Sequence, residues 1–175
     1  GAEILRLRYP DREQEIRQII SGVHAKRTKV SKEKTMQGRL LYSPEEMNRQ
    51  FREQFHACGY HELRDHYTIT IPGSTVAIPN AYKQVDFVKD KVLVEVQFGK
   101  YTYMFYDLAK FQYFFNESKA DLGVEVVACH NLQRQMSSGV SYGEQLVYDI
   151  ERLRRHFPAV PVMIMLIDVG ADDDG

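Results

Sequence analysis

The period of the hydrophobic and polar positions changes along the chain and divides it into helical and extended segments. Apolar residues recur every three or four positions over 11–23 and over 44–58, which is typical of amphipathic helices. The second segment has the stronger boundaries, because Ser43 and Glu46 have the spacing of a capping box and Gly59 is suited to end a helix. We therefore expect two helices in the first third of the chain.

Beyond these helices the apolar positions mostly alternate, as they do in strands. The pattern predicts strands over 67–71, 85–88, 92–98 and 123–129, a helix over 106–116, a loop over 137–143, and a last helix that Ser141 and Glu144 open as a second capping box. The apolar run over 162–169 predicts a central strand covered on both faces. This order predicts an α/β fold, with a mixed central β-sheet flanked by helices, in a single domain over 1–175.

Composition agrees with one ordinary globular domain. The 175 residues are 43% hydrophobic and 27% charged, with a net charge of −1. No apolar run approaches the roughly 20 residues that cross a bilayer, so we expect no membrane partner. Cys58 and Cys129 lack metal-ligand spacing and fit a reducing, cytoplasmic interior better than a disulfide scaffold.

The charges are unevenly distributed. Six basic residues but only one acid, Glu33, lie between His24 and Arg39, and an acidic tail occupies 170–175. A basic segment on a near-neutral protein can contact phosphates, or it can be a solvated surface loop; charge alone favours the loop.

The strand over 92–98 carries the candidate chemistry. Glu95 and Gln97 share one of its faces, and Asp86 lies on the preceding strand, so that a hairpin brings Asp86 close to Glu95. Two converging carboxylates suit Mg²⁺, which can polarise a phosphodiester and lower the pKa of a bound water. The alternative is a half-exposed strand with a polar outer face, and the spacing alone favours that alternative.

Three segments resemble one enzyme family. The stretch "VDFVKDKVLVEVQFGKY" is similar to the catalytic hairpin of the BglII- and BstYI-type restriction endonucleases, a subgroup of the PD-(D/E)XK nucleases in which glutamine replaces the motif lysine. The stretch "SKEKTMQGRLLYSPEEMN" resembles the segment that opens the family's long helix, and "MSSGVSYGEQL" resembles a loop that faces DNA. The resemblance runs in the same order from about Ile16 to Val169.

This resemblance implies roles for the residues of the hairpin. Asp86 and Glu95 would bind the metal together with the backbone carbonyl of Val96, and Gln97 would orient the attacking water. Gln97 can neither act as a base nor carry a positive charge, so it cannot replace the lysine in full. Glu62 is a further catalytic candidate, with a plain surface glutamate as the alternative.

The resemblance also implies a DNA-binding surface. Lys100 would reach a base edge near the scissile phosphate, where a lysine can donate to guanine; otherwise it is an ordinary exposed lysine. Residues of the loop and the basic segment would contact bases or phosphates, although Ser141 is also the expected N-cap: Ser137, Ser138, Ser141, Tyr142, Lys26, Arg27, Lys29, Lys32 and Lys34.

The function implied is that of a type II restriction endonuclease in the cytoplasm of a prokaryote. It would be a homodimer that uses Mg²⁺, with Mn²⁺ as a substitute, to hydrolyse both strands of double-stranded DNA at a six-base site centred on GATC, leaving four-base 5′ overhangs. A DNA methyltransferase would be its functional counterpart rather than a bound subunit. Two alternatives stay open, namely a repair nuclease that nicks DNA and a DNA-binding protein with an inactive site.

Overall fold

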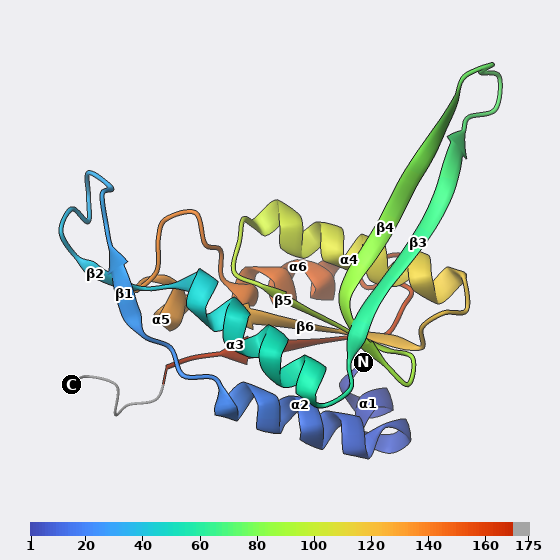
Figure 1. Ribbon diagram of the computed structural model, residues 1–175. Coiled ribbons are helices and arrows are strands. Elements are labelled where there is room, and N and C mark those ends of the chain that lie inside the picture. The colour runs from blue at the N-terminus through green and yellow to red at the C-terminus, as the bar shows by residue number, and fades with distance from the viewer. Residues whose placement is uncertain (170–175) are drawn as a thin grey trace.

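The computed structural model describes residues 1–169, and the acidic tail expected over 170–175 lies outside the described residues. In chain order the elements are α1 (Ala2–Arg8), α2 (Pro10–Gly22), β1 (Arg27–Val30), β2 (Leu40–Tyr42), α3 (Pro44–Ala57), β3 (His61–Thr70), β4 (Ala77–Lys89), β5 (Val92–Gln97), α4 (Tyr101–Asn116), β6 (Leu122–Ala128), α5 (His130–Gln133), α6 (Gly143–Leu153) and β7 (Val162–Ile167) (Figure 1).

A five-stranded sheet with the order β3-β4-β5-β6-β7 forms the centre of the fold. Strands β3, β4 and β5 make an antiparallel meander, and β5, β6 and β7 run parallel. The predicted mixed sheet is therefore confirmed. The predicted position of the last strand was wrong, because β7 lies at the edge of the sheet and not at its centre. Side chains of β7 do pack into the hydrophobic cores on both faces of the sheet. An apolar run predicts that both faces of a strand are covered, but it does not predict which strands lie beside it.

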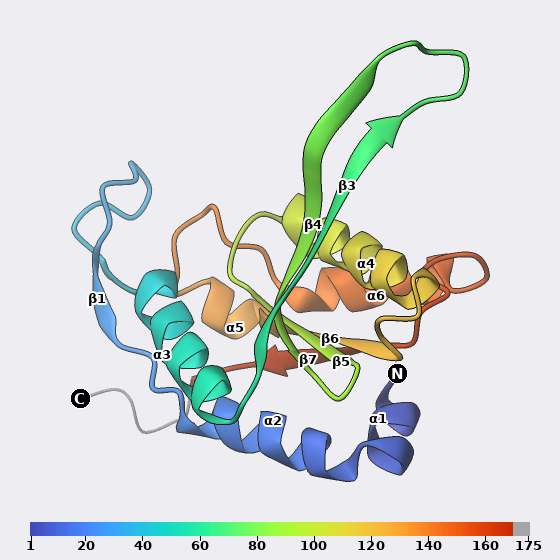
Figure 2. The same cartoon turned by 45° about the vertical axis from the view of Figure 1, so that its right-hand side comes forward.

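Helices cover both faces of this sheet, which makes three layers (Figures 1 and 2). Helices α2 and α3 pack on one face, around Phe51 and Phe55, in a core that also holds Val92 and Val94 of β5. Helices α4 and α6 pack on the other face, where Leu93 of β5 contributes to the second core. Both faces of β5 are thus enclosed, and no helix within residues 1–169 is long and apolar enough to cross a membrane.

Strands β3 and β4 extend well beyond the body of the protein as a long two-stranded arm (Figure 2). The sequence predicted only short strands here and left 72–84 unassigned, whereas β4 begins at Ala77. The outer part of the arm is exposed on both faces, so its residues are not under the selection for alternating burial that makes strands recognisable.

The helix boundaries were predicted best where a side chain caps the backbone. Ser43 accepts a hydrogen bond from the Glu46 amide at 3.4 Å, which confirms it as the N-cap, but the Ser43 amide donates to the Lys26 carbonyl rather than to Glu46, so the capping box is only half formed. The second capping box was wrong: α6 begins at Gly143 after Tyr142, and Glu144 instead accepts hydrogen bonds from the His130 amide. Helices α1 and α5 and the small sheet of β1 and β2 were not predicted.

Candidate active site

The turn between β4 and β5 sets the register of the two strands. Asp90 and Lys91 adopt positive φ values of 49° and 64°, which closes a two-residue hairpin connection. The ladder ends at the pair Phe87–Val94, so Asp86 and Glu95 are the next residues along the two strands. The register between β3 and β4 shifts between Val85 and Val88, and Asp86 lies close enough for its charge to add to the raised pKa of Glu95.

Glu95 is enclosed in the protein rather than on a solvated face. Its side chain is on the side of the sheet that α4 covers, and the residue is only 3% exposed. Burial raises the pKa of Glu95 to about 8; Lys110 opposes this increase, and the carboxylates of Asp107 and Asp86 add to it. The alternative of a half-exposed strand with a polar outer face is therefore wrong for Glu95.

Two residues of α4 connect Glu95 to Gln97. The ammonium group of Lys110 contacts Oε1 of Glu95 and lies 2.7 Å from Oδ1 of Asp107. The other oxygen of Asp107 accepts a hydrogen bond of 3.0 Å from Nε2 of Gln97. Burial disfavours the ammonium ion, but the two carboxylates outweigh it and raise the pKa of Lys110. The result is one continuous polar chain from Glu95 to Gln97.

A third carboxylate lies beside this chain on the next strand. Glu125 of β6 is the parallel neighbour of Glu95 and is fully buried. Neither of its oxygens has a hydrogen-bond donor. Burial, with the nearby charges of Asp107 and Glu95, raises the pKa of Glu125 well above its usual range. A protonated Glu125 could donate to Asp107, so this group is best accommodated in its neutral form.

The side chains at this site can supply only part of the ligand shell of a divalent cation. Within residues 1–169, no three His, Cys, Asp or Glu side chains are grouped so that they could hold a metal ion. Asp86 and Glu95 offer two hard-oxygen donors, and magnesium is commonly held by one or two carboxylates with water and substrate phosphate completing the shell. The accumulated negative charge that raises the pKa of Glu95 also favours a cation here.

Glu62 lies on the strand next to Asp86, in the register shift between the pairs His61–Val88 and Leu63–Val85. It sits on β3, and its Oε2 accepts a hydrogen bond of 2.6 Å from Gln84, while its Oε1 is 3.1 Å from Arg64. Both carboxylate oxygens are thus engaged along the base of the arm, which matches the alternative of a surface glutamate.

The segment after β5 lies directly against the predicted serine loop. The Ser141 amide donates a hydrogen bond of 2.9 Å to the Gly99 carbonyl, next to the exposed Lys100 that precedes α4. Met136 and Val140 anchor the loop in the core, which leaves Ser138 exposed. Lys100 and the loop therefore border the open end of the hairpin together.

The basic segment lies beside the same loop. Lys29 donates to Ser137 over 3.4 Å, and Arg27 donates to Gln135 over 2.5 Å. Glu33, the single acid of the segment, accepts the Ser138 amide at 3.1 Å. Most of the segment's cations are exposed: Lys26, Lys29, Lys32 and Lys34. The structure thus brings two of the predicted DNA-contacting segments to one side of the hairpin.

Sequence reasoning missed the polar residues on the facing helix and strand. Asp107 stands beside Leu108 in the buried stripe of α4, and Glu125 interrupts the apolar strand β6. Glu95 carries the same signal, because it lies between Val94 and Val96 in an apolar strand. Lys110 carries the complementary signal, because it follows Asp107 by three positions on one helix face.

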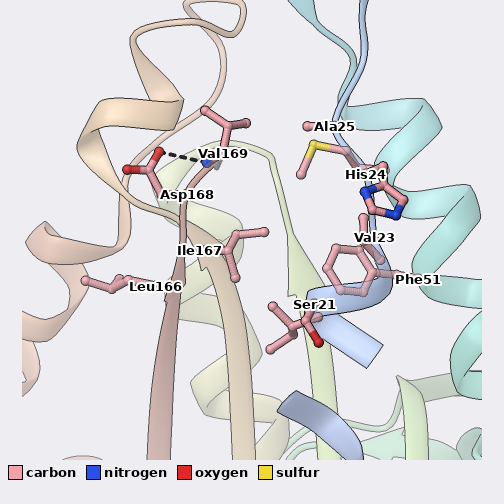
Figure 3. A pocket seen from close by; sticks show the side chains of 11 residues that line it. Ser21, Val23, His24, Ala25, Phe51, Leu166, Ile167, Asp168 and Val169 are labelled. Atoms are coloured by element: carbon pink, nitrogen blue, oxygen red, sulfur yellow. Dashed lines mark hydrogen bonds between the residues drawn. The ribbon is translucent and has the colours of Figure 1, made fainter. Parts of the chain in front are cut away.

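A pocket of about 440 Å³ lies elsewhere, between the end of α2, α3 and the end of β7 (Figure 3). Several of its polar groups already have partners: Asp168 accepts the Val169 amide at 2.9 Å, and the His24 amide donates to Gln50 over 2.9 Å. None of the predicted site residues lines this pocket, so the open end of the hairpin is the better candidate site.

Comparison with known proteins identifies the family of the chain. The family profile described as "Restriction endonuclease BglII/BglIII" matches residues 1–167. Among solved structures, the chain is similar to restriction endonuclease BglII complexed with a DNA 16-mer (TM-score 0.68, 18% identity, covering 91% of this chain and 70% of that one). It is also similar to free BglII (TM-score 0.61, 19% identity, covering 91% and 72%). At this identity the structures show a shared fold.

A search of curated proteins found no match to the chain. The family profile nonetheless spans nearly all of the described residues, including the hairpin, α4 and the serine loop. The chain belongs to the BglII/BglIII family of restriction endonucleases and is a type II site-specific deoxyribonuclease.

Proposed function

We propose that this endonuclease uses Mg²⁺ at Asp86 and Glu95 to hydrolyse both strands of a palindromic DNA site. The observation that supports this most directly is that Asp86 and Glu95 follow the last pair of the β4–β5 ladder and that the charge of Asp86 adds to the raised pKa of Glu95. Lys110 contacts Oε1 of Glu95, which leaves Oε2 for a cation, and the Val96 carbonyl is the proposed backbone ligand. Mn²⁺ is the expected substitute, since it also prefers oxygen ligands.

The roles of the side chains follow from their chemistry. Mg²⁺ when bound would stabilise charge on the phosphate and lower the pKa of water. Gln97 has no titratable group, so it orients the attacking water rather than deprotonating it. Attack on phosphorus leaves a 5′-phosphate and a 3′-hydroxyl. Glu62 is omitted from this set because Gln84 and Arg64 occupy its carboxylate.

Double-stranded DNA is the proposed partner, and the surface beside the hairpin supports this. Lys100 and the serine loop (Ser137, Ser138, Ser141 and Tyr142) would read bases or position the backbone, and the basic segment would contact phosphates. The Ser141 amide is committed to Gly99, so the hydroxyls of Ser137 and Ser138 are the better candidates for base contacts. BglII, a protein of the same fold, has been crystallised with a DNA 16-mer.

The target we propose is a six-base site centred on GATC, cut to leave four-base 5′ overhangs. The likeness of the hairpin and of the serine loop to the BglII- and BstYI-type enzymes supports this target. A palindrome has two-fold symmetry, so a homodimer with one site per subunit is the expected assembly. A methyltransferase that protects the same site is the expected functional counterpart, in the cytoplasm of a prokaryote.

One digestion tests the proposal. Purified protein is incubated with plasmid DNA and Mg²⁺, with EDTA and Glu95→Gln as negative controls, and the fragment ends are sequenced. Discrete fragments with 5′-GATC overhangs support the proposal. Nicked plasmid would indicate a nicking nuclease, retention of uncut plasmid would indicate an inactive DNA-binding protein, and a different overhang would refute the proposed target.

A further inference from the structure

The orientation of the Gln97 amide is fixed by its neighbour on α4. Asp107 accepts from Gln97 Nε2 with one carboxylate oxygen while its other oxygen accepts from Lys110. An ionised carboxylate can only accept, so turning the amide over would set the Gln97 oxygen against a second acceptor. The amino group of Gln97 must therefore face Asp107.

The other end of the same amide points toward the segment that leads to Lys100. A β-carbon built on Gly99 would lie only 2.6 Å from Oε1 of Gln97, which shows how closely this oxygen approaches the backbone after β5. Asp107 is buried and its partner Lys110 is partly buried, so the contact that orients Gln97 is shielded from competing water. Gln97 consequently presents its carbonyl oxygen, an acceptor, toward the segment between β5 and α4.

We infer that Asp107 is a positioning residue for the cleavage reaction, which holds Gln97 so that its carbonyl oxygen accepts a hydrogen bond from the attacking water. Lys110 supports this arrangement, because its ammonium group contacts the carboxylates of Asp107 and Glu95 at the same time. The inference rests on the proposed role of Gln97, and it specifies that Gln97 acts on the water as a hydrogen-bond acceptor. It gives a reason for a buried aspartate in the apolar stripe of α4.

Moving the negative charge from position 107 to position 97 tests this inference. In Asp107→Asn, the introduced amide keeps its oxygen on Lys110 and its amino group toward Gln97, which forces the Gln97 amide to turn and present a donor. In Gln97→Glu, two carboxylates face each other. In the double variant, the introduced glutamate accepts from the introduced asparagine and again offers an acceptor to the water, with the net charge of the site unchanged.

Single-turnover cleavage at saturating Mg²⁺ is measured for the four proteins. We expect Asp107→Asn and Gln97→Glu each to be slower than the wild type by about 10–100-fold, the usual effect of removing a partner that orients a reacting group. The double variant should be faster than either single variant. If Asp107→Asn cleaves like the wild type, or if the double variant is no faster than the slower single variant, the inference is wrong.

Two measurements without metal separate positioning from folding. Thermal unfolding in EDTA should show the double variant recovering stability that each single variant loses, and gel shifts in EDTA should show similar DNA binding by all four proteins. Asp65→Asn is the matched control, since Asp65 pairs with Lys119 and Tyr113 near the other end of α4 and should leave cleavage unchanged. A wild type that cuts no DNA would contradict the proposed function; a wild type that cuts, without recovery in the double variant, contradicts only this inference.

Discussion

Glu95 gives the sharpest link between the structure and a measurable property. Burial raises the pKa of Glu95 from its usual value of 4.5 to about 8, so the folded protein holds a proton that the unfolded chain releases between these two values. The associated stability is fully present below pH 4.5 and is lost as the pH rises through 8. Replacing Glu95 with glutamine removes this dependence, because the amide does not titrate.

The size of the effect follows from the two pKa values. With pKa values of about 8 in the folded protein and 4.5 in the unfolded chain, Glu95 contributes about 3 kcal/mol to the free energy of unfolding at pH 6 and almost nothing at pH 9. Between these pH values the wild type should therefore lose about 3 kcal/mol relative to Glu95→Gln.

Urea unfolding in EDTA at pH 6, 7.5 and 9 measures this difference. Glu151→Gln, which removes an exposed carboxylate of α6, is the control and should follow the wild type. Glu95→Gln should also lack detectable cleavage of plasmid DNA with Mg²⁺. Parallel stability curves for the wild type and Glu95→Gln over this range would refute the reasoning, since they would mean that burial does not hold a proton on Glu95.

Three further predictions test other parts of the molecule. Ser43→Ala should lower the free energy of unfolding by about 1 kcal/mol in urea titrations, because it removes the cap of α3, whereas Ser43→Asp should retain most of the stability. Lys32→Ala and Lys34→Ala should each reduce the salt dependence of DNA binding by about one counterion in gel shifts at several ionic strengths; an unchanged slope would remove these lysines from the interface. Chelation of the metal with EDTA should stop cleavage but preserve DNA binding, and cleavage that continues in EDTA would contradict the metal site.

The parts of the fold that could be predicted are those in which one local rule decides the outcome. The cap at Ser43 and the positive φ of Gly59 set the ends of α3 from a few neighbouring residues. The arm could not be predicted in full, because its length depends on pairing between distant segments and its outer faces stay in water. The edge position of β7 depends on which other strands pair with it, and the residues of β7 alone do not determine that pairing.

The candidate site was predictable to the extent that one strand carries it. Alternation along β5 placed Glu95 and Gln97 on one face, and the hairpin turn brought Asp86 near enough to act on the pKa of Glu95. The charges that act on Glu95 come from α4 and β6, and strand periodicity contains no information about what packs above a strand. Family resemblance supplied the roles of the hairpin residues but did not point to Asp107 or Lys110.

The distribution of charge explains why charged residues in otherwise apolar elements point to the site. Glu95, Asp107 and Glu125 are buried around a single cation, Lys110, which is an unfavourable arrangement for folding alone. A core that needed only stability would fill these positions with apolar side chains of similar volume. The arrangement is sensible if a divalent cation binds beside it, because cation binding releases the proton that burial holds on Glu95 and makes its carboxylate a ligand. A carboxylate in an apolar strand or helix stripe is thus a physical pointer to the site, independent of any motif.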